Sequence, residues 1–99
     1  MTDLEELRKQ IDSIDADMIR LFEKRMETSE AVALFKKQHG ISVDDPGRED
    51  EIIRRNSGKI SRKWRGSYRR FQKYLFKLSK AHQKKVLADN TTAEEEKQA

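Results

Sequence analysis

The first third of the chain carries a heptad-spaced apolar seam that is interrupted by one arginine. The seam consists of Leu4, Leu7, Ile11, Ile14, Met18, Leu21, Arg25, Thr28, Val32 and Phe35. This spacing predicts one face of an α-helix that packs against another helix. A guanidinium on such a face needs an anionic partner or water, because burying it unpaired is costly. Arg25 therefore indicates a binding site for an anionic group.

Two further cations lie on the same side of this predicted helix. Arg8 follows Leu7 and Lys36 follows Phe35, so each stands one place past a seam position. At 1.5 Å per residue they are about 42 Å apart and cannot meet within one straight helix. If two copies pack antiparallel about an axis near Met18, Arg8 of the partner subunit falls between Arg25 and Lys36. The pattern predicts a homodimer with two composite sites.

Local signals set the bounds of this first helix. Thr2 and Glu5 form a predicted capping box, and Gly40 is a suitable C-terminal stop. No Pro or Gly lies between Met1 and His39, so nothing breaks the helix. Its length of about 54 Å exceeds the diameter of a 99-residue globule. We expect a partner chain to cover its far end.

Two further helices are predicted. Asp45 is the expected N-cap and Pro46 the first residue of a short helix that ends near residues 56–58. A third helix reaches about Leu87, with Ser79 and Gln83 on the edge of its inner stripe. That stripe is Trp64, Tyr68, Phe71, Leu75 and Leu78. The predicted fold is all-α, with helices in the order long, short, long.

Composition limits what this fold can do alone. Hydrophobic residues make up 34% of the chain and charged residues 40%, too little apolar surface for a self-sufficient monomer. The absence of cysteine excludes disulfides, thiol catalysis and cysteine-ligated zinc. Without an apolar leader or span, a cytoplasmic protein is expected. Residues 1–88 are predicted to form one helical domain, and residues 89–99 a disordered polar tail.

The charged residues do not include an evident acid–base pair. No nucleophile with an activating partner is recognisable, and His39 and His82 stand apart from any such arrangement. His39 is expected to be solvated at a helix end, and His82 to be structural. Any reaction at this site should rest on positioning and electrostatic stabilisation.

Four segments carry a resemblance to a known family. LRKQIDSID, LFEKRM, DDPGREDEII and LSKAHQ are similar to the all-helical class of chorismate mutases, which are intertwined three-helix dimers, over about residues 4–87. The resemblance implies conversion of chorismate to prephenate, a step of aromatic amino-acid biosynthesis in the shikimate pathway. That rearrangement needs no metal or cofactor. The protein would hold a compact conformer and stabilise charge on the breaking ether bond.

The same resemblance assigns a role to each matching residue. Arg8 of the partner subunit and Arg25 would bind the substrate carboxylates. Lys36 and Gln83 would donate to the ether oxygen, where negative charge grows. The remaining contacts, to the ring hydroxyl, the ring and a carboxylate, would come from Glu49, Asp45, Arg48 and Ser79. Fusion to another enzyme and feedback control are left open by the sequence.

Two alternatives remain. The first is a lyase on the same fold that removes pyruvate from isochorismate, although the segment from Asp45 to Glu49 resembles the mutases more closely. The second is a non-catalytic basic helical protein that binds nucleic acid or a partner helix. Residues 52–88 carry 13 Lys or Arg and no Asp or Glu, with aromatic residues interleaved. Because those aromatic residues fall at helix-core spacing, a solvated helix face is the simpler interpretation.

Overall fold

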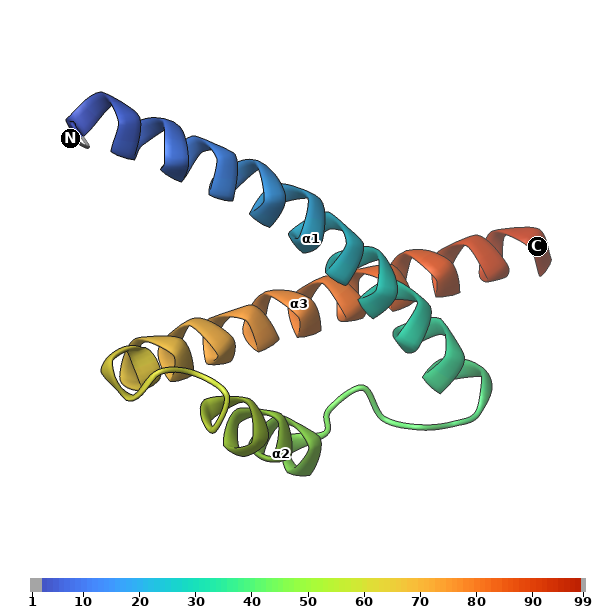
Figure 1. Cartoon of the computed structure of the whole chain (residues 1–99). Coiled ribbons are helices and arrows are strands. Elements are labelled where there is room, and N and C mark those ends of the chain that lie inside the picture. Colours follow the sequence, from blue (N-terminus) through green and yellow to red (C-terminus); the bar gives the residue numbers. More distant parts are fainter. Residues whose placement is uncertain (1–2, 99) are drawn as a thin grey trace.

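The described part of the chain forms three α-helices and one short turn of 3₁₀-helix. The computed structural model describes the backbone of residues 3–98 and the side chains of residues 3–89. Its elements are α1 (Leu4–Gln38), α2 (Pro46–Ser57), η1 (Arg62–Trp64) and α3 (Arg65–Gln98). α1 crosses α3 near the middle of α3, and α2 lies beside the first half of α3 (Figure 1). No strand occurs in residues 3–98, which confirms the predicted all-α, long–short–long order.

α1 is continuous, and both of its ends are capped by local hydrogen bonds. The N-cap is Asp3, whose carboxylate accepts from the backbone N–H of Glu6 at 2.9 Å. The predicted capping box is one residue out of register, because the N-cap is Asp3. Thr2 itself lies outside the described residues. At the other end Gly40 has φ +64°, and Ile41 N–H donates to the Lys36 carbonyl at 2.8 Å. Gly40 is the stop that the sequence predicted.

α2 begins and ends where the sequence predicts. Asp45 accepts from the backbone N–H of Arg48 at 3.1 Å, and Pro46 occupies the first helical position. After α2 the chain turns through η1 into α3. Arg65 holds this turn by donating to the carbonyls of Ser57 at 2.7 Å and Ile60 at 3.1 Å. The short helix is thereby fixed against the start of α3.

α3 differs from the prediction in the face that it buries. Its buried residues are Gln72, Phe76, Ser79 and Gln83, four positions that share one helical stripe. The predicted inner stripe was wrong at Trp64 and Phe71, which are 57% and 54% exposed, whereas Tyr68, Leu75 and Leu78 are partly buried. The apolar pattern marked a face that α1 and α2 cover only in part.

α3 also runs further than predicted. The backbone is helical to Gln98, well beyond the expected end near Leu87. No Pro or Gly follows Gly66, and Ala, Glu, Lys and Gln near the end are strong helix formers. The division into a domain of residues 1–88 and a polar tail of residues 89–99 stays a prediction.

The molecule is elongated and has almost no core of its own. Its radius of gyration is 18.1 Å, against about 13 Å for a compact chain of this length. Among the described side chains, the buried apolar residues are Ala33 and Phe76. Seam residues of the N-terminal half of α1, such as Leu7, Ile11 and Ile14, are 46–56% exposed. Within the described residues, no helix is apolar over the length that a bilayer span requires.

Candidate functional site

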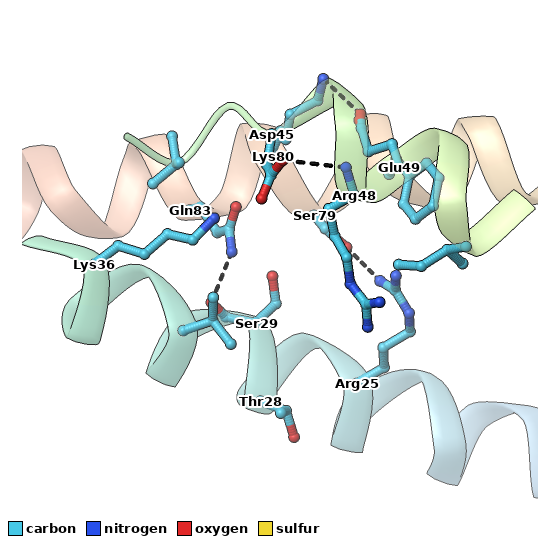
Figure 2. Close-up of a pocket in the computed structure, with 14 residues that line it drawn as sticks. Arg25, Thr28, Ser29, Lys36, Asp45, Arg48, Glu49, Ser79, Lys80 and Gln83 are labelled. Carbon is cyan, nitrogen blue, oxygen red and sulfur yellow. Dashed lines mark hydrogen bonds and ion pairs between the residues drawn. The ribbon is translucent and has the colours of Figure 1, made fainter. Parts of the chain in front are cut away.

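The three helices and the loop before α2 line an open cavity of about 360 Å³ beside the crossing of α1 and α3 (Figure 2). That volume suits a small organic molecule. The residues that line it are Arg25, Thr28, Ser29, Val32, Lys36, Val43, Asp45, Arg48, Glu49, Ile52, Phe76, Ser79, Lys80 and Gln83. Seven of the eight residues selected from the sequence are in this set. Arg8 is not.

α1 supplies two cations to the cavity from one face. Arg25 and Lys36 are 11 residues, close to three turns, apart, so their side chains project in similar directions. Arg25 donates to the Ser79 hydroxyl and lies 5.9 Å from the centre of the Phe76 ring. Burial lowers the pKa of the Arg25 guanidinium, and Tyr68 partly opposes this. The group remains charged at neutral pH, so it enters the cavity as a partly desolvated cation.

Lys36 is the second of these cations. Its side chain extends from α1 toward Gln83 (Figure 2). It has no ion pair with any side chain in the described part of the chain. An ammonium in this position has three N–H donors to offer to an oxygen inside the cavity.

The first turn of α2 supplies carboxylates and an arginine. Asp45 caps the helix, and Arg48 and Glu49 follow within one turn. Lys80 of α3 forms an ion pair with Glu49 Oε1 at 3.1 Å. Glu49 Oε2 is buried and has no hydrogen-bond partner among the described residues. A buried carboxylate oxygen of this kind is an unused acceptor that a ligand hydroxyl could satisfy.

α3 supplies the polar wall of the cavity. Ser79 and Gln83 are each only 7% exposed, one turn apart on the buried stripe. Gln83 Nε2 donates to the backbone carbonyl of Ser29 at 3.0 Å. Because a carbonyl can only accept, this bond fixes which end of the amide is the donor. The second N–H of the amide remains for a ligand.

Sequence reasoning missed Lys80 and three of the four apolar wall residues, because only Val32 belongs to the predicted seam. Lys80 lies four residues after Phe76 and three before Gln83, so helical periodicity around Gln83 would have placed it near the site. Its partner Glu49 could not be identified without the packing of α2 on α3. The apolar walls are Val32, Val43, Ile52 and Phe76.

Arg8 is separated from this cavity by the length of α1. It lies 17 residues before Arg25, about 26 Å along the helix axis. The N-terminal half of α1 extends away from α2 and α3 (Figure 1), and every residue from Leu4 to Lys24 is exposed. Within one chain, Arg8 cannot contact a ligand in the cavity.

The lining determines what the cavity can bind. Four cationic side chains face two carboxylates, one of which is already paired with Lys80. The arrangement favours a small anion with an apolar body and at least one hydroxyl. Within the described residues, no cluster of His, Asp and Glu is arranged to hold a metal ion. The groups present are suited to binding, orientation and charge stabilisation.

Comparison with known proteins agrees with this description. Residues 7–84 match the model of the family described as chorismate mutase type II. The chain therefore belongs to the chorismate mutase type II family, the class to which the sequence resemblance assigned it.

Three curated relatives are similar to about half of the chain. They are the T-protein of Haemophilus influenzae (45% identical over 53 residues), the chorismate mutase of Methanocaldococcus jannaschii (42% over 52) and the bifunctional chorismate mutase/prephenate dehydratase of Aquifex aeolicus (36% over 53). The matches cover 54%, 52% and 54% of this chain. They cover 14%, 52% and 15% of the relatives, so the chain spans about half or less of each. No solved structure matches the chain significantly.

Proposed function

We propose that this protein is a chorismate mutase, an isomerase that converts chorismate to prephenate by intramolecular rearrangement. The single observation that carries the proposal is that one cavity gathers seven residues selected from the sequence, drawn from three helices. Family membership supports the same reaction class. Chorismate is a dicarboxylate with a ring hydroxyl, which suits a cationic cavity that also holds a free carboxylate oxygen.

The cations would bind the substrate and hold it in a reactive shape. Arg25, already oriented by Ser79, would take one carboxylate, and Arg48 would approach the other. Holding both ends of a flexible molecule in a compact conformer removes much of the entropic barrier to a unimolecular rearrangement. Val32 and Phe76 would exclude water from its apolar body.

Two donors would stabilise the transition state. As the ether bond breaks, negative charge grows on its oxygen, and Lys36 together with the free N–H of Gln83 would donate to that atom. Both groups are available for this role, since Lys36 has no ion pair in the described structure and one Gln83 N–H remains unused.

Carboxylates would hold the ring. Glu49 Oε2 would accept from the ring hydroxyl, while Lys80 keeps Oε1 in place. Asp45 would assist from the start of α2, where it also caps the helix. No metal or cofactor enters this scheme.

The proposal includes a homodimer in which Arg8 of the partner subunit completes each site. The proposal is supported by the exposed seam of α1 and by the near absence of a core in the single chain. It is also supported by the distance of about 26 Å between Arg8 and Arg25 along one helix, at about 1.5 Å per residue. An antiparallel pairing of the N-terminal halves would cover the seam and deliver a third guanidinium to each cavity.

Identifying the reaction products tests the proposed function. The purified protein is incubated with chorismate and, separately, with isochorismate, and the products are separated and identified. We expect prephenate from chorismate. Salicylate and pyruvate from isochorismate without prephenate from chorismate would assign the related lyase activity. Turnover of neither compound would contradict an enzymatic role.

A further inference from the structure

A second connection between α1 and α3 lies just outside the cavity. His82 Nε2 and Glu30 Oε1 are 2.5 Å apart and part-buried, and neither residue lines the cavity. Glu30 follows Ser29 on α1, and His82 precedes Gln83 on α3. The bond therefore stands next to the Gln83–Ser29 hydrogen bond and joins the same two helices. We propose that Glu30 and His82 are positioning residues that hold the Gln83 amide in its donating orientation, an inference that rests on the proposed mutase function.

The geometry explains why a pair at this position would act through Gln83. Gln83 is held to α1 by one side-chain bond to a backbone carbonyl. If α3 rotates slightly about its axis, that bond lengthens and the amide N–H leaves the cavity. A bond from the preceding residue to the following residue of α1 resists this rotation, because the two bonds lie on different sides of the helix. A shift of about 1 Å in the position of a catalytic group can lower the rate by up to about 10²-fold.

The pair can be removed without removing any group that lines the cavity. Glu30 and His82 are 43% and 31% exposed in their side chains, so loss of their contact leaves a solvated site and not an unpaired buried charge. The adjacent connection between Arg25 and Ser79 remains to hold the helices together. This separation makes a positioning role distinguishable from a general contribution to folding.

The first experiment measures kcat and KM for Glu30→Ala, His82→Ala and Glu30→Gln. We expect Glu30→Ala and His82→Ala each to lower kcat about 10-fold with KM changed less than about 2-fold, because the Gln83 contact strengthens in the transition state. Glu30→Gln keeps an oxygen that accepts from His82, so its kcat should stay within about 2-fold of wild type. Glu27→Ala is the matched control, an exposed glutamate one turn earlier on α1, and should also leave kcat unchanged.

The decisive comparison places the same change in a Gln83→Ala background. If Glu30 acts through Gln83, adding Glu30→Ala there should lower kcat less than about 2-fold. An undiminished 10-fold loss in that background, or an equal loss in Glu30→Gln and Glu30→Ala, would overturn the proposal.

A readout that does not depend on activity separates this inference from the proposed function. The side-chain amide signal of Gln83 in a nitrogen–proton NMR spectrum should shift in Glu30→Ala and His82→Ala, and remain in place in Glu30→Gln and Glu27→Ala. A signal that does not respond to Glu30→Ala contradicts the positioning role even if the enzyme is active. A responsive signal in a protein that fails to convert chorismate would reject the function and retain the link between the pair and Gln83.

Discussion

The two halves of α1 share one sequence pattern and have opposite environments. Residues 25–36 include the part of α1 that packs against α3, and five of them, Arg25, Thr28, Ser29, Val32 and Lys36, line the cavity. Residues 4–24 continue the same heptad seam, yet every one of them is exposed. The pattern is therefore a property of the whole helix, whereas the partner that would bury it is present within the chain for one half only. A long exposed apolar seam is what an interface between subunits requires.

The difference also separates two kinds of cation. Arg25 is desolvated, hydrogen-bonded to Ser79 and next to Phe76. Arg8 lies on the exposed half with no contact to the cavity. Arg25 can contact a ligand in the cavity of its own chain. Arg8 can do so only if a second chain brings its exposed half of α1 to the packed half of the first. The following experiments test that relation.

The largest effect is expected in the packed half. Lys36→Ala removes a donor to the breaking ether oxygen and should lower kcat ~10²–10³-fold, with a much smaller change in KM. Lys24→Ala is the control, since Lys24 lies exposed on the same helix and outside the cavity. Steady-state kinetics with chorismate measure both variants. Near-normal turnover of Lys36→Ala would remove the residue from the mechanism.

A smaller effect is expected from a charge on the exposed seam. Ile14→Asp should raise the Kd of the dimer about 10²-fold, because two carboxylates per dimer would be buried against apolar surface. Ala16→Asp makes a similar change away from the seam and should leave association intact. Analytical ultracentrifugation over a range of concentrations measures the Kd. Equal association of both variants, or a monomeric wild type, would contradict the role given to this half.

The smallest expected change is the partial recovery of activity when two inactive variants are mixed. Arg8→Ala and Arg25→Ala homodimers should each be nearly inactive. After mixing and re-equilibration, half of the dimers are mixed and each has one intact site, so activity should return to about a quarter of wild type. Mixing Arg25→Ala with Lys36→Ala is the matched control, because both changes lie in the packed half. If the dimer is built as proposed, that mixture has no intact site, and recovery equal to the first mixture would exclude shared sites.

Local sequence predicted most of the secondary structure. Asp45 and Pro46 begin α2, and Gly40 ends α1 with φ +64°, as expected from their backbone preferences. The errors were equally local. Asp3 caps α1 in place of Thr2, and α3 continues past Leu87 because strong helix formers follow.

The face of α3 was not predictable from its apolar residues. The sequence placed Phe71 on the inner face, but the most buried stripe carries Gln72, Ser79 and Gln83. Periodicity identifies an apolar face without stating which neighbour covers it. Here α1 and α2 pack against the stripe that carries these polar residues, and two of them, Ser79 and Gln83, line the cavity. Trp64 and Phe71 are therefore exposed in the single chain, although the predicted inner stripe included both.

The sequence by itself determined the three helices and most of their ends, because capping and helix propensity act over a few residues along the chain. Spacing along the seam identified Arg25 and Lys36, and the resemblance to the chorismate mutases added Asp45, Arg48, Glu49, Ser79 and Gln83. Only the tertiary structure decided that Glu49 pairs with Lys80, that Glu30 meets His82 and that Gln83 donates to Ser29. The members of these pairs lie roughly 30 to 54 positions apart in the chain, and their contacts depend on how α1 and α2 pack against α3. That packing is set by the sum of many weak contacts and not by any local pattern.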